Sequence, residues 1–334
     1  MEEPIITVRN LQTFFHLEGR VSKAVDNVSF SVPKGKVICI VGESGCGKSV
    51  TALSLLRLVD FPGRIAGGEI LFHNRNILKM NTKEIHNLRG DKISMIFQEP
   101  MTSLNPVFTI GRQISETLLE HTLCDRKEAW EKGVELIKKV GLPRAEKIMD
   151  SYPHELSGGM LQRVMIAIAL SCQPELLIAD EPTTALDVTI QAQVLDLLRQ
   201  LRDQSDMSIL FITHDLGVVA EIADYVIVMY AGRIIEEAPV TELFRHPRHP
   251  YTRGLLKSRP VIGQRRDRLY SIKGQVPDLS ELPQGCYFAD RCESCMEACR
   301  KEYPEFVSDA GGHKTACLLY KEGVANGSTT AEDY

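Results

Sequence analysis

One glycine-rich octapeptide constrains this chain more than any other feature. It follows a short β-branched run, 36–41, that is typical of a buried strand, and it precedes an apolar helix predicted from Ser49 to about Val59. The octapeptide fits the pattern G-x-x-x-x-G-K-[ST], in which successive backbone N–H groups surround phosphate oxygens at the positive end of a helix dipole. The alternative is a chance glycine-rich turn, which this strand and helix context disfavours. The residues expected to bind a nucleotide here are Gly42, Glu43, Ser44, Gly45, Cys46, Gly47, Lys48, Ser49 and Val50.

Within this loop, two side chains have expected roles. Lys48 is expected to reach the β- and γ-phosphates, and the Ser49 hydroxyl is expected to bind Mg²⁺. A second motif lies downstream, where the apolar run 176–179 ends in Asp180 and Glu181. Asp180 is expected to help hold Mg²⁺ from its outer coordination shell, and Glu181 to accept a proton from the attacking water. Adjacent acids at a strand end can also be mere surface, but the upstream phosphate motif favours the catalytic interpretation.

The remaining pattern predicts an α/β fold. Buried-strand runs at 176–179, 208–212 and 225–228 are separated by helical stretches such as 188–202, which indicates a mostly parallel sheet covered on both faces. We therefore predict an ATPase domain over 1–245 with a helical subdomain inserted at about 100–166. Residues 246–334 form a distinct extension that contains five cysteines and ends, from 323, in a tail expected to be disordered.

Composition narrows the function classes. The 334 residues carry a net charge of −5, which disfavours nucleic-acid binding. No apolar run approaches the ~18 residues that a membrane helix needs, and the acidic start of the chain does not resemble a signal peptide. We expect a cytosolic protein.

A third motif resembles the signature sequence of ABC ATPases. It runs Leu156-Ser157-Gly158-Gly159-Met160-Leu161-Gln162, just before the Asp180–Glu181 motif, and offers a hydroxyl and backbone N–H groups at a helix start. The alternative is an N-capped helix and nothing more. Met160 stands where the family most often has Gln, and we expect activity to survive this change. The residues expected to contact nucleotide from this motif are Ser157, Gly158 and Gly159.

Other segments match the same family in its usual order. Gln98 resembles the glutamine that contacts Mg²⁺ and the attacking water, and His214 resembles the switch histidine at the γ-phosphate. Ala185-Leu186-Asp187 resembles the D-loop, so Asp187 is a further nucleotide-site residue. Phe15 matches the aromatic residue that stacks on adenine, although Phe14 could take that role, or both could be core residues.

The resemblance to ABC ATPases covers about residues 4–245 and implies a complete architecture. The implied fold is a RecA-like P-loop NTPase core with an antiparallel β subdomain and an inserted helical subdomain. The implied enzyme is an ATPase that uses ATP and Mg²⁺, with Glu181, His214 and Gln98 as catalytic residues. Two subunits would pair head to tail, so that each ATP lies between one subunit's P-loop and the other's signature. Bound ATP would favour the closed dimer.

Three further segments resemble the dipeptide and oligopeptide importer branch of that family. They are Gln98–Pro106, His249–Arg253, and Gly285–Cys292 with its continuation Gly312–Cys317. The resemblance implies a peripheral subunit on the cytoplasmic face of the cell membrane. Its expected partners are two permeases, a second ATPase subunit (a paralogue or a second copy) and, indirectly, an external solute-binding protein, with no nucleic acid. Nickel and glutathione importers are the nearest alternatives.

The cysteine-rich extension adds a cofactor expectation. Cys286, Cys292, Cys299 and Cys317 match four cysteines on which members of this branch hold a [4Fe–4S] cluster, and four thiolates suit such a cluster. Four thiolates also suit Zn²⁺, and Cys292 and Cys295 form a C-x-x-C pair of the zinc type. Cys295 is extra relative to the branch, so the choice of ligands is open by one residue, with Cys295 as the alternative ligand. Free thiols are the third alternative to a cluster or zinc.

Two functions of other classes remain as alternatives. One is a soluble ABC ATPase that acts on DNA or ribosomes, but this chain has one cassette, no heptad array and a negative net charge. The other is an iron–sulfur regulator with a degenerate nucleotide site, which the intact Lys48, Glu181 and His214 disfavour. Co-purification with permeases would separate both from a transport ATPase.

Overall fold

The computed structural model describes residues 3–17, 19–184, 186–258, 270–309 and 311–321. The chain forms two compact units that interleave along the sequence. The first comprises Met1–Thr7, Ser31–Val37 and Ile70–Ile212, and the second comprises Val8–Phe30, Ile38–Glu69 and Thr213–Tyr334. Each unit is described separately.

The first unit contains parallel strands that end in functional residues. Strands β6 (Ile93–Ile96), β7 (Leu176–Asp180) and β8 (Ser208–Thr213) lie in the order β8-β7-β6, and both pairings are parallel. Every residue of β7 and β8 is buried, which explains why these strands read as continuous apolar runs instead of alternating ones. Helix α8 (Val188–Ser205) connects β7 to β8 along the chain.

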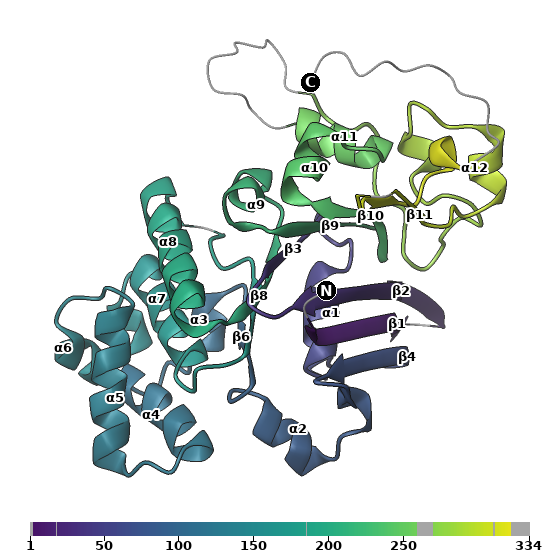
Figure 1. Cartoon of the computed structure of the whole chain (residues 1–334). Coiled ribbons are helices and arrows are strands. Elements are labelled where there is room, and N and C mark those ends of the chain that lie inside the picture. Colours follow the sequence, from purple (N-terminus) through teal and green to yellow (C-terminus); the bar gives the residue numbers. More distant parts are fainter. Residues whose placement is uncertain (1–2, 18, 185, 259–269, 310, 322–334) are drawn as a thin grey trace. The chain divides into compact units, whose positions relative to one another are not determined.

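Most of the helices of the first unit fall in one stretch of sequence. The largest group is made by α4 (Ile110–His121), α5 (Arg126–Lys139), α6 (Ala145–Asp150) and α7 (Gly158–Ala169), which pack together and appear as one teal and blue group in Figure 1. Asp125 begins α5 with a capping box to Glu128, which fixes the helix start. Gly111 of α4 lies so close to α5 that an added Cβ would be 2.5 Å from the Trp130 ring. The other helices of this unit are α2 (Thr82–Leu88), α3 (Pro100–Ser103) and α8, with short 3₁₀ turns η1 (Ile77–Lys79) and η2 (Pro153–Glu155).

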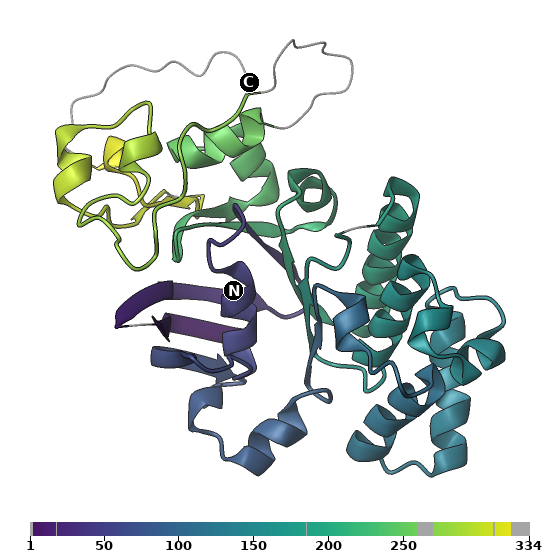
Figure 2. The same ribbon diagram turned by 180° about the vertical axis from the view of Figure 1, so that it is seen from behind.

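The N-terminal strands form a separate sheet. Strands β1 (Pro4–Leu17), β2 (Arg20–Pro33), β4 (Gly63–Phe72) and β5 (Arg75–Asn76) lie in the order β2-β1-β4-β5. Figure 2 shows the purple strands β1 and β2 side by side. Along β2, Val28, Phe30 and Val32 are buried and the residues between them are exposed. One face of this sheet is therefore exposed to solvent.

The second unit joins the phosphate loop to a mixed sheet. Strand β3 (Val37–Val41) pairs in parallel with β9 (Tyr225–Tyr230), and helix α1 (Lys48–Leu55) follows β3. Strand β10 (Arg233–Pro239) returns antiparallel to β9 through Ala231 and Gly232, whose φ angles of 44° and 82° suit a two-residue hairpin. The sheet is therefore less parallel than the sequence suggests, because a tight turn needs no crossover helix.

The cysteine-rich segment continues this same sheet. Strand β12 (Lys314–Thr315) pairs antiparallel with β10, and β11 (Val307–Ser308) pairs with β12. The predicted boundary near residue 245 stays a prediction, and the tail from 323 lies outside the described residues. The other elements of this unit are α9 (Leu216–Ile222), α10 (Val240–Arg245), α11 (Pro250–Lys257), η3 (Ala289–Arg291), α12 (Glu297–Lys301) and η4 (Leu318–Tyr320). Among the helices that the structure describes, none has the length and apolarity to cross a membrane.

Candidate functional site

The phosphate loop depends on two glycines that approach other backbone segments. A Cβ on Gly42 would lie 2.3 Å from the carbonyl oxygen of Met229, and a Cβ on Gly47 would lie 2.2 Å from that of Ala24. Gly47 also has a φ of 101° where it caps α1, a conformation that side chains disfavour. The first and last glycines of the motif are thus required by the fold around them.

The loop holds its lysine in a buried position. Lys48 is 5% exposed, and its Nζ donates to the carbonyl oxygens of Gly42 at 2.8 Å and Glu43 at 3.1 Å. Cys46 is fully buried, and burial raises the pKa of its thiol, so it stays protonated. Ser44 and Gly45 are exposed, whereas Ser49 and Val50 are half-buried.

Two other predicted residues of the second unit lie outside the loop. Phe15 on β1 packs against Gly63, where an added Cβ would lie 2.7 Å from its ring, and both Phe14 and Phe15 are half-buried. The choice between these two aromatic residues therefore stays open. His214 follows β8 directly and is exposed.

The first unit brings Gln98 and Glu181 together. The Glu181 carboxylate accepts hydrogen bonds from Gln98 Nε2 at 3.1 Å and from Thr184 Oγ1 at 2.9 Å. Its backbone has a φ of 46°, which is strained for a residue with a side chain, and its N–H donates to the Ile212 carbonyl at 2.9 Å. Strain of this kind persists where surrounding contacts enforce it and is concentrated at functional sites. Asp180, one residue earlier, is 4% exposed at the end of β7.

The signature segment forms a helix start with an open approach. Ser157 precedes α7 as its N-cap, but its side chain does not cap the helix. A Cβ on Gly158 would meet nothing within 4 Å, whereas one on Gly159 would lie 3.1 Å from Ile190. The Ser157 hydroxyl is thus not committed to capping, as a purely structural N-cap would require.

The D-loop lies directly before α8. Asp187 is the N-cap of that helix and accepts a hydrogen bond from the Ile190 N–H at 2.9 Å. Ala185 lies outside the described residues.

The cysteines of the extension gather around a small apolar cluster. The Cys286 N–H donates to the Cys299 carbonyl at 2.7 Å, and Cys286, Cys295 and Cys299 all pack in this cluster. Burial, with a smaller contribution from the neighbouring cysteines, raises the pKa of Cys286 to about 11 and that of Cys317 to about 12. The described residues contain no group of three or more His, Cys, Asp or Glu side chains arranged to hold a metal ion. The four thiols of Cys286, Cys292, Cys299 and Cys317 are the donor type that a [4Fe–4S] cluster needs, but in this structure they are not arranged to hold one.

Sequence reasoning missed two residues that contact the phosphate loop. Arg291 forms an ion pair with Glu43, and the Tyr251 hydroxyl accepts a hydrogen bond from the Glu43 N–H. Both residues stand inside segments that resemble the peptide-importer branch, so their presence in those segments was a signal. The sequence does not reveal Glu43 as their shared partner, because Tyr251 and Arg291 each lie more than 200 positions from it along the chain.

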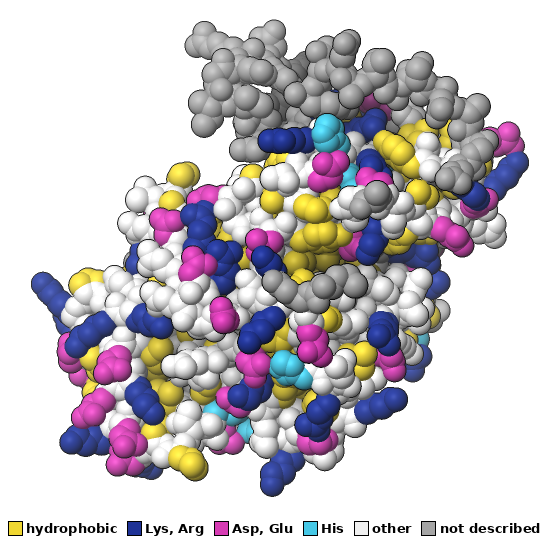
Figure 3. All heavy atoms as spheres, viewed as in Figure 1, with side chains coloured by type: hydrophobic (Ala, Val, Ile, Leu, Met, Phe, Trp, Pro, Cys, Tyr) yellow, Lys and Arg dark blue, Asp and Glu magenta, His cyan; other side chains and the backbone are white. Residues whose placement is uncertain are grey.

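The surface charge is mixed on the face that Figure 3 displays. Lys and Arg side chains are interspersed there with Asp and Glu side chains. This mixture differs from the concentrated basic surface that binds nucleic acid.

Comparisons with known proteins agree with this geometry. Residues 25–184 match the family model described as "ABC transporter", and residues 235–299 match "Oligopeptide/dipeptide transporter, C-terminal region". The chain is 52% identical over 325 residues to the oligopeptide transport ATP-binding protein AppD of Bacillus subtilis (strain 168), covering 97% of this chain and 99% of that one. It is 45% identical over 313 residues to the dipeptide transport ATP-binding protein DppD of Escherichia coli (strain K12), covering 94% and 96%.

A solved structure gives a further likeness. It is a dimeric ATP-binding cassette in a post-hydrolysis state bound to ADP and Pi, with a TM-score of 0.64 and 26% identity. The likeness covers 70% of this chain and 98% of that one.

Proposed function

Because this chain belongs to the ABC transporter family, in its oligopeptide and dipeptide branch, we propose that it hydrolyses ATP to power uptake of dipeptides or oligopeptides through partner permeases. ATP hydrolysis coupled to transport is the activity of this family. One observation carries the proposal for this chain: Glu181 has a strained backbone at the end of β7, and its carboxylate is held by Gln98 and Thr184. A carboxylate in such a position can orient and deprotonate water.

The roles of the other residues follow from their chemistry. Lys48, with the amides of the phosphate loop, binds the phosphates, and Phe15 or Phe14 stacks on the base. Ser49, Gln98 and Asp180 hold Mg²⁺, which neutralises phosphate charge when bound. His214 contacts the γ-phosphate, while Ser157, Gly158, Gly159 and Asp187 serve the nucleotide of a partner copy.

We also propose where the chain lies, which proteins it binds and what the assembly carries. We place the chain on the cytoplasmic face of the membrane, bound to two permeases and to a second ATPase subunit, with a paralogue favoured over a second copy. The names of the relatives, oligopeptide and dipeptide transport proteins, support peptides as cargo. An external binding protein delivers the peptide to the permeases.

Reconstitution tests the cargo and the coupling together. The chain is co-expressed with candidate permeases and a candidate second ATPase subunit, and ATP-dependent uptake of peptides into vesicles is measured. Wild type should take up di- or oligopeptides, and Lys48→Ala should stop both uptake and ATP hydrolysis at this site. Uptake of nickel or glutathione in place of peptide would assign the chain to those importers, and an ATPase that never binds permeases would refute the transport role.

We also propose that Cys286, Cys292, Cys299 and Cys317 hold a [4Fe–4S] cluster, with Cys295 as a substitute ligand. The raised thiol pKa values mean that cluster assembly must displace protons, so incorporation should be weaker at low pH. Iron, sulfide and zinc assays on anaerobically purified protein, with its visible absorption spectrum, decide the matter. A colourless protein with one zinc per chain would replace the cluster with Zn²⁺.

A further inference from the structure

Glu43, the second residue of the phosphate loop, contacts two residues of the C-terminal extension. Glu43 offers three polar groups, and each has a partner. Its N–H donates to the Tyr251 hydroxyl at 2.8 Å, its carbonyl accepts from Lys48 Nζ at 3.1 Å, and its carboxylate pairs with Arg291. All of these residues belong to the second unit.

Arg291 and Glu43 form a bidentate ion pair. Arg291 NH1 and NH2 donate to the two carboxylate oxygens of Glu43 at 2.6 and 2.9 Å, a geometry that fixes orientation as well as distance. The Arg291 side chain is 5% exposed and that of Glu43 is 29% exposed, so solvent screens the pair only in part. The hydrogen bonds that Arg291 donates to Glu43 raise the pKa of Arg291, which therefore stays charged.

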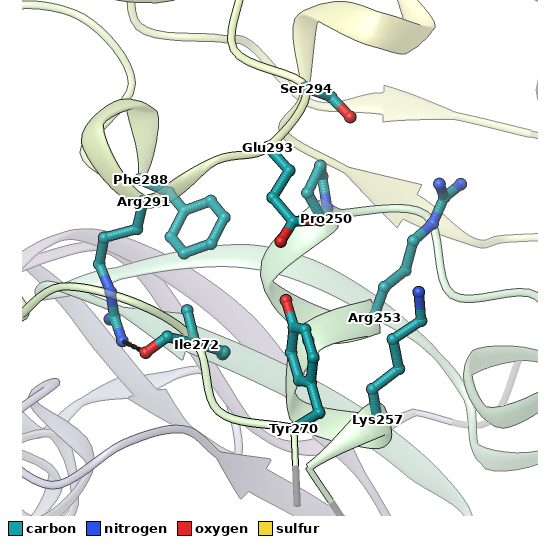
Figure 4. Close-up of a pocket in the computed structure, with 10 residues that line it drawn as sticks. Pro250, Arg253, Lys257, Tyr270, Ile272, Phe288, Arg291, Glu293 and Ser294 are labelled. Carbon is teal, nitrogen blue, oxygen red and sulfur yellow. Dashed lines mark hydrogen bonds between the residues drawn. The ribbon is translucent and has the colours of Figure 1, made fainter. Parts of the chain in front are cut away.

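Arg291 is itself held rigidly by its neighbours. Its Nε donates to the Lys273 carbonyl at 3.0 Å, and NH1 lies 3.3 Å from the Tyr230 hydroxyl. Figure 4 shows the guanidinium directed toward Ile272, whose carbonyl accepts from NH2 at 3.5 Å, and away from the centre of a pocket that Tyr270 and Glu293 help to line. A side chain fixed at this many points can transmit the position of the extension to Glu43.

Tyr251 supplies a second fixed point on the same residue. It is fully buried at the start of α11, and its ring packs against Tyr230 at 4.7 Å and Phe288 at 5.5 Å between centroids. Burial raises the pKa of its hydroxyl, so the group stays neutral and can accept the Glu43 N–H. The hydrogen bond directs this N–H toward Tyr251, while the Cys46 N–H of the same loop donates to the Glu43 carbonyl at 3.3 Å.

We infer that Arg291 and Tyr251 are positioning residues of the nucleotide site, through which the C-terminal extension holds the phosphate loop in its binding shape. The inference rests on the proposed ATP binding but concerns residues that do not touch the nucleotide. Releasing Glu43 lowers the fraction of molecules with a competent loop, and apparent affinity falls by that fraction. Weakening should therefore appear in the Kd and KM for ATP, while kcat at saturating ATP changes little.

Two variants and one matched control test this assignment in the full-length chain. Arg291→Met removes the ion pair, and Tyr251→Phe removes one oxygen while keeping the ring packing. Arg300→Met is the control, because it breaks an exposed ion pair of the same extension, with Asp290, that does not involve the loop. Binding of Mg-ATP is measured by calorimetry, hydrolysis by steady-state kinetics, and folding by the thermal midpoint.

The expected result is a rise of roughly tenfold in the Kd and KM for ATP in Arg291→Met, a rise of about threefold in Tyr251→Phe, and no change in Arg300→Met. Arg291→Lys should recover part of the affinity, since it restores charge without the fork. Should Arg291→Met lower the thermal midpoint yet bind Mg-ATP as wild type does, Arg291 is purely structural and the inference fails.

Two further outcomes are decisive. If Arg291→Met does not fold, Tyr251→Phe carries the test alone, and unchanged affinity in it overturns the inference. A wild-type chain that neither binds nor hydrolyses Mg-ATP would instead overturn the proposed function.

Discussion

At the residue scale, Glu181 combines strain with a fixed carboxylate. Its φ of 46° costs free energy in an isolated chain, on the order of 1 kcal/mol or more. The hydrogen bonds from Gln98 and Thr184 hold its carboxylate in one orientation. In the function we propose, this cost is retained because the orientation of the carboxylate serves the attack of water on the γ-phosphate.

Replacing the carboxylate by its amide tests this role. Glu181→Gln keeps the size of the side chain and an oxygen that can accept from Gln98, so the fold should survive. Without a base, we expect ATP turnover to fall by roughly 10²–10⁴-fold while ATP binding persists. Turnover is measured by phosphate release, and retained ATP by filtration. Thr184→Val, which removes one hydrogen bond to Glu181, should give a smaller loss of about tenfold. Wild-type turnover in Glu181→Gln would show that another group is the base.

Sequence patterns single out some of these residues and not others, for a physical reason. The phosphate loop, Asp180 and Glu181 are readable because each lies in a short segment whose strand, turn and helix are local. The Glu43–Arg291 pair joins positions 248 residues apart, and charge pairing over that distance leaves no periodic trace. The strain at Glu181 also escapes sequence reasoning, since a left-handed backbone is expected at glycine and not at glutamate.

At the element scale, the segments that the pattern specifies most strongly are those buried on both faces. Strands β7 and β8 begin where the apolar runs begin, at 176 and 208, because every one of their side chains is buried. The antiparallel edge formed by β10, β12 and β11 was not foreseen. Strands β11 and β12 span two residues each, too few to show alternation.

Helices α4 and α5 make a contact that depends on one glycine. In Gly111→Val, a side chain would enter the space of the Trp130 ring and of the Met149 carbonyl, which lie 2.5 and 2.7 Å from an added Cβ. We expect the free energy of unfolding to fall by about 2 kcal/mol, as overpacking usually costs. Urea unfolding followed by tryptophan fluorescence measures it. Glu116→Val, an exposed position of the same helix, controls for the β-branched residue and should cost well under 1 kcal/mol. Equal losses in the two variants would contradict the packing argument.

Strand β2 makes a buried ion pair with β10. Asp26 is 4% exposed and accepts from Arg233 at 2.6 and 2.9 Å, while the Arg233 guanidinium lies 4.1 Å from the centre of the Tyr303 ring. Asp26→Ala leaves the half-buried arginine without its carboxylate, so we expect a loss of about 2–3 kcal/mol. The control is Arg20→Ala, on the same strand β2, which breaks an exposed ion pair with Glu281. It should change the free energy of unfolding by less than about 1 kcal/mol. Chemical denaturation of both variants would test this, and a stable Asp26→Ala chain would count against it.

At the scale of the whole molecule, stability should depend on pH through a histidine that the fold keeps neutral. His249 is 1% exposed, and burial lowers its pKa from 6.5 to about 4, partly offset by Glu236, which raises it, while Arg253 adds to the lowering. Its Nδ1 accepts the Tyr251 N–H at 3.1 Å, and its ring packs on Phe288 at 5.7 Å. A proton on this ring would remove the acceptor and place a buried charge there.

The sign follows from which state binds the proton. In the unfolded chain His249 takes up a proton below its ordinary pKa, whereas in the folded chain it does not until about pH 4. Its contribution is therefore complete above pH ~6.5 and is lost progressively as pH falls toward 4. Between about pH 7.5 and pH 5, this residue alone should lower the free energy of unfolding by about 2 kcal/mol.

Urea unfolding at a series of pH values measures that slope, and His249→Asn isolates the residue. Asparagine can still accept the hydrogen bond that caps α11 but does not titrate. Other groups, chiefly carboxylates, titrate in both chains, so the difference between the two slopes reports His249. We expect His249→Asn to be less stable at neutral pH, because the ring packing is lost, and to lose about 2 kcal/mol less than wild type on acidification. Parallel curves for the two chains would mean that His249 takes up its proton in the folded state as readily as in the unfolded one.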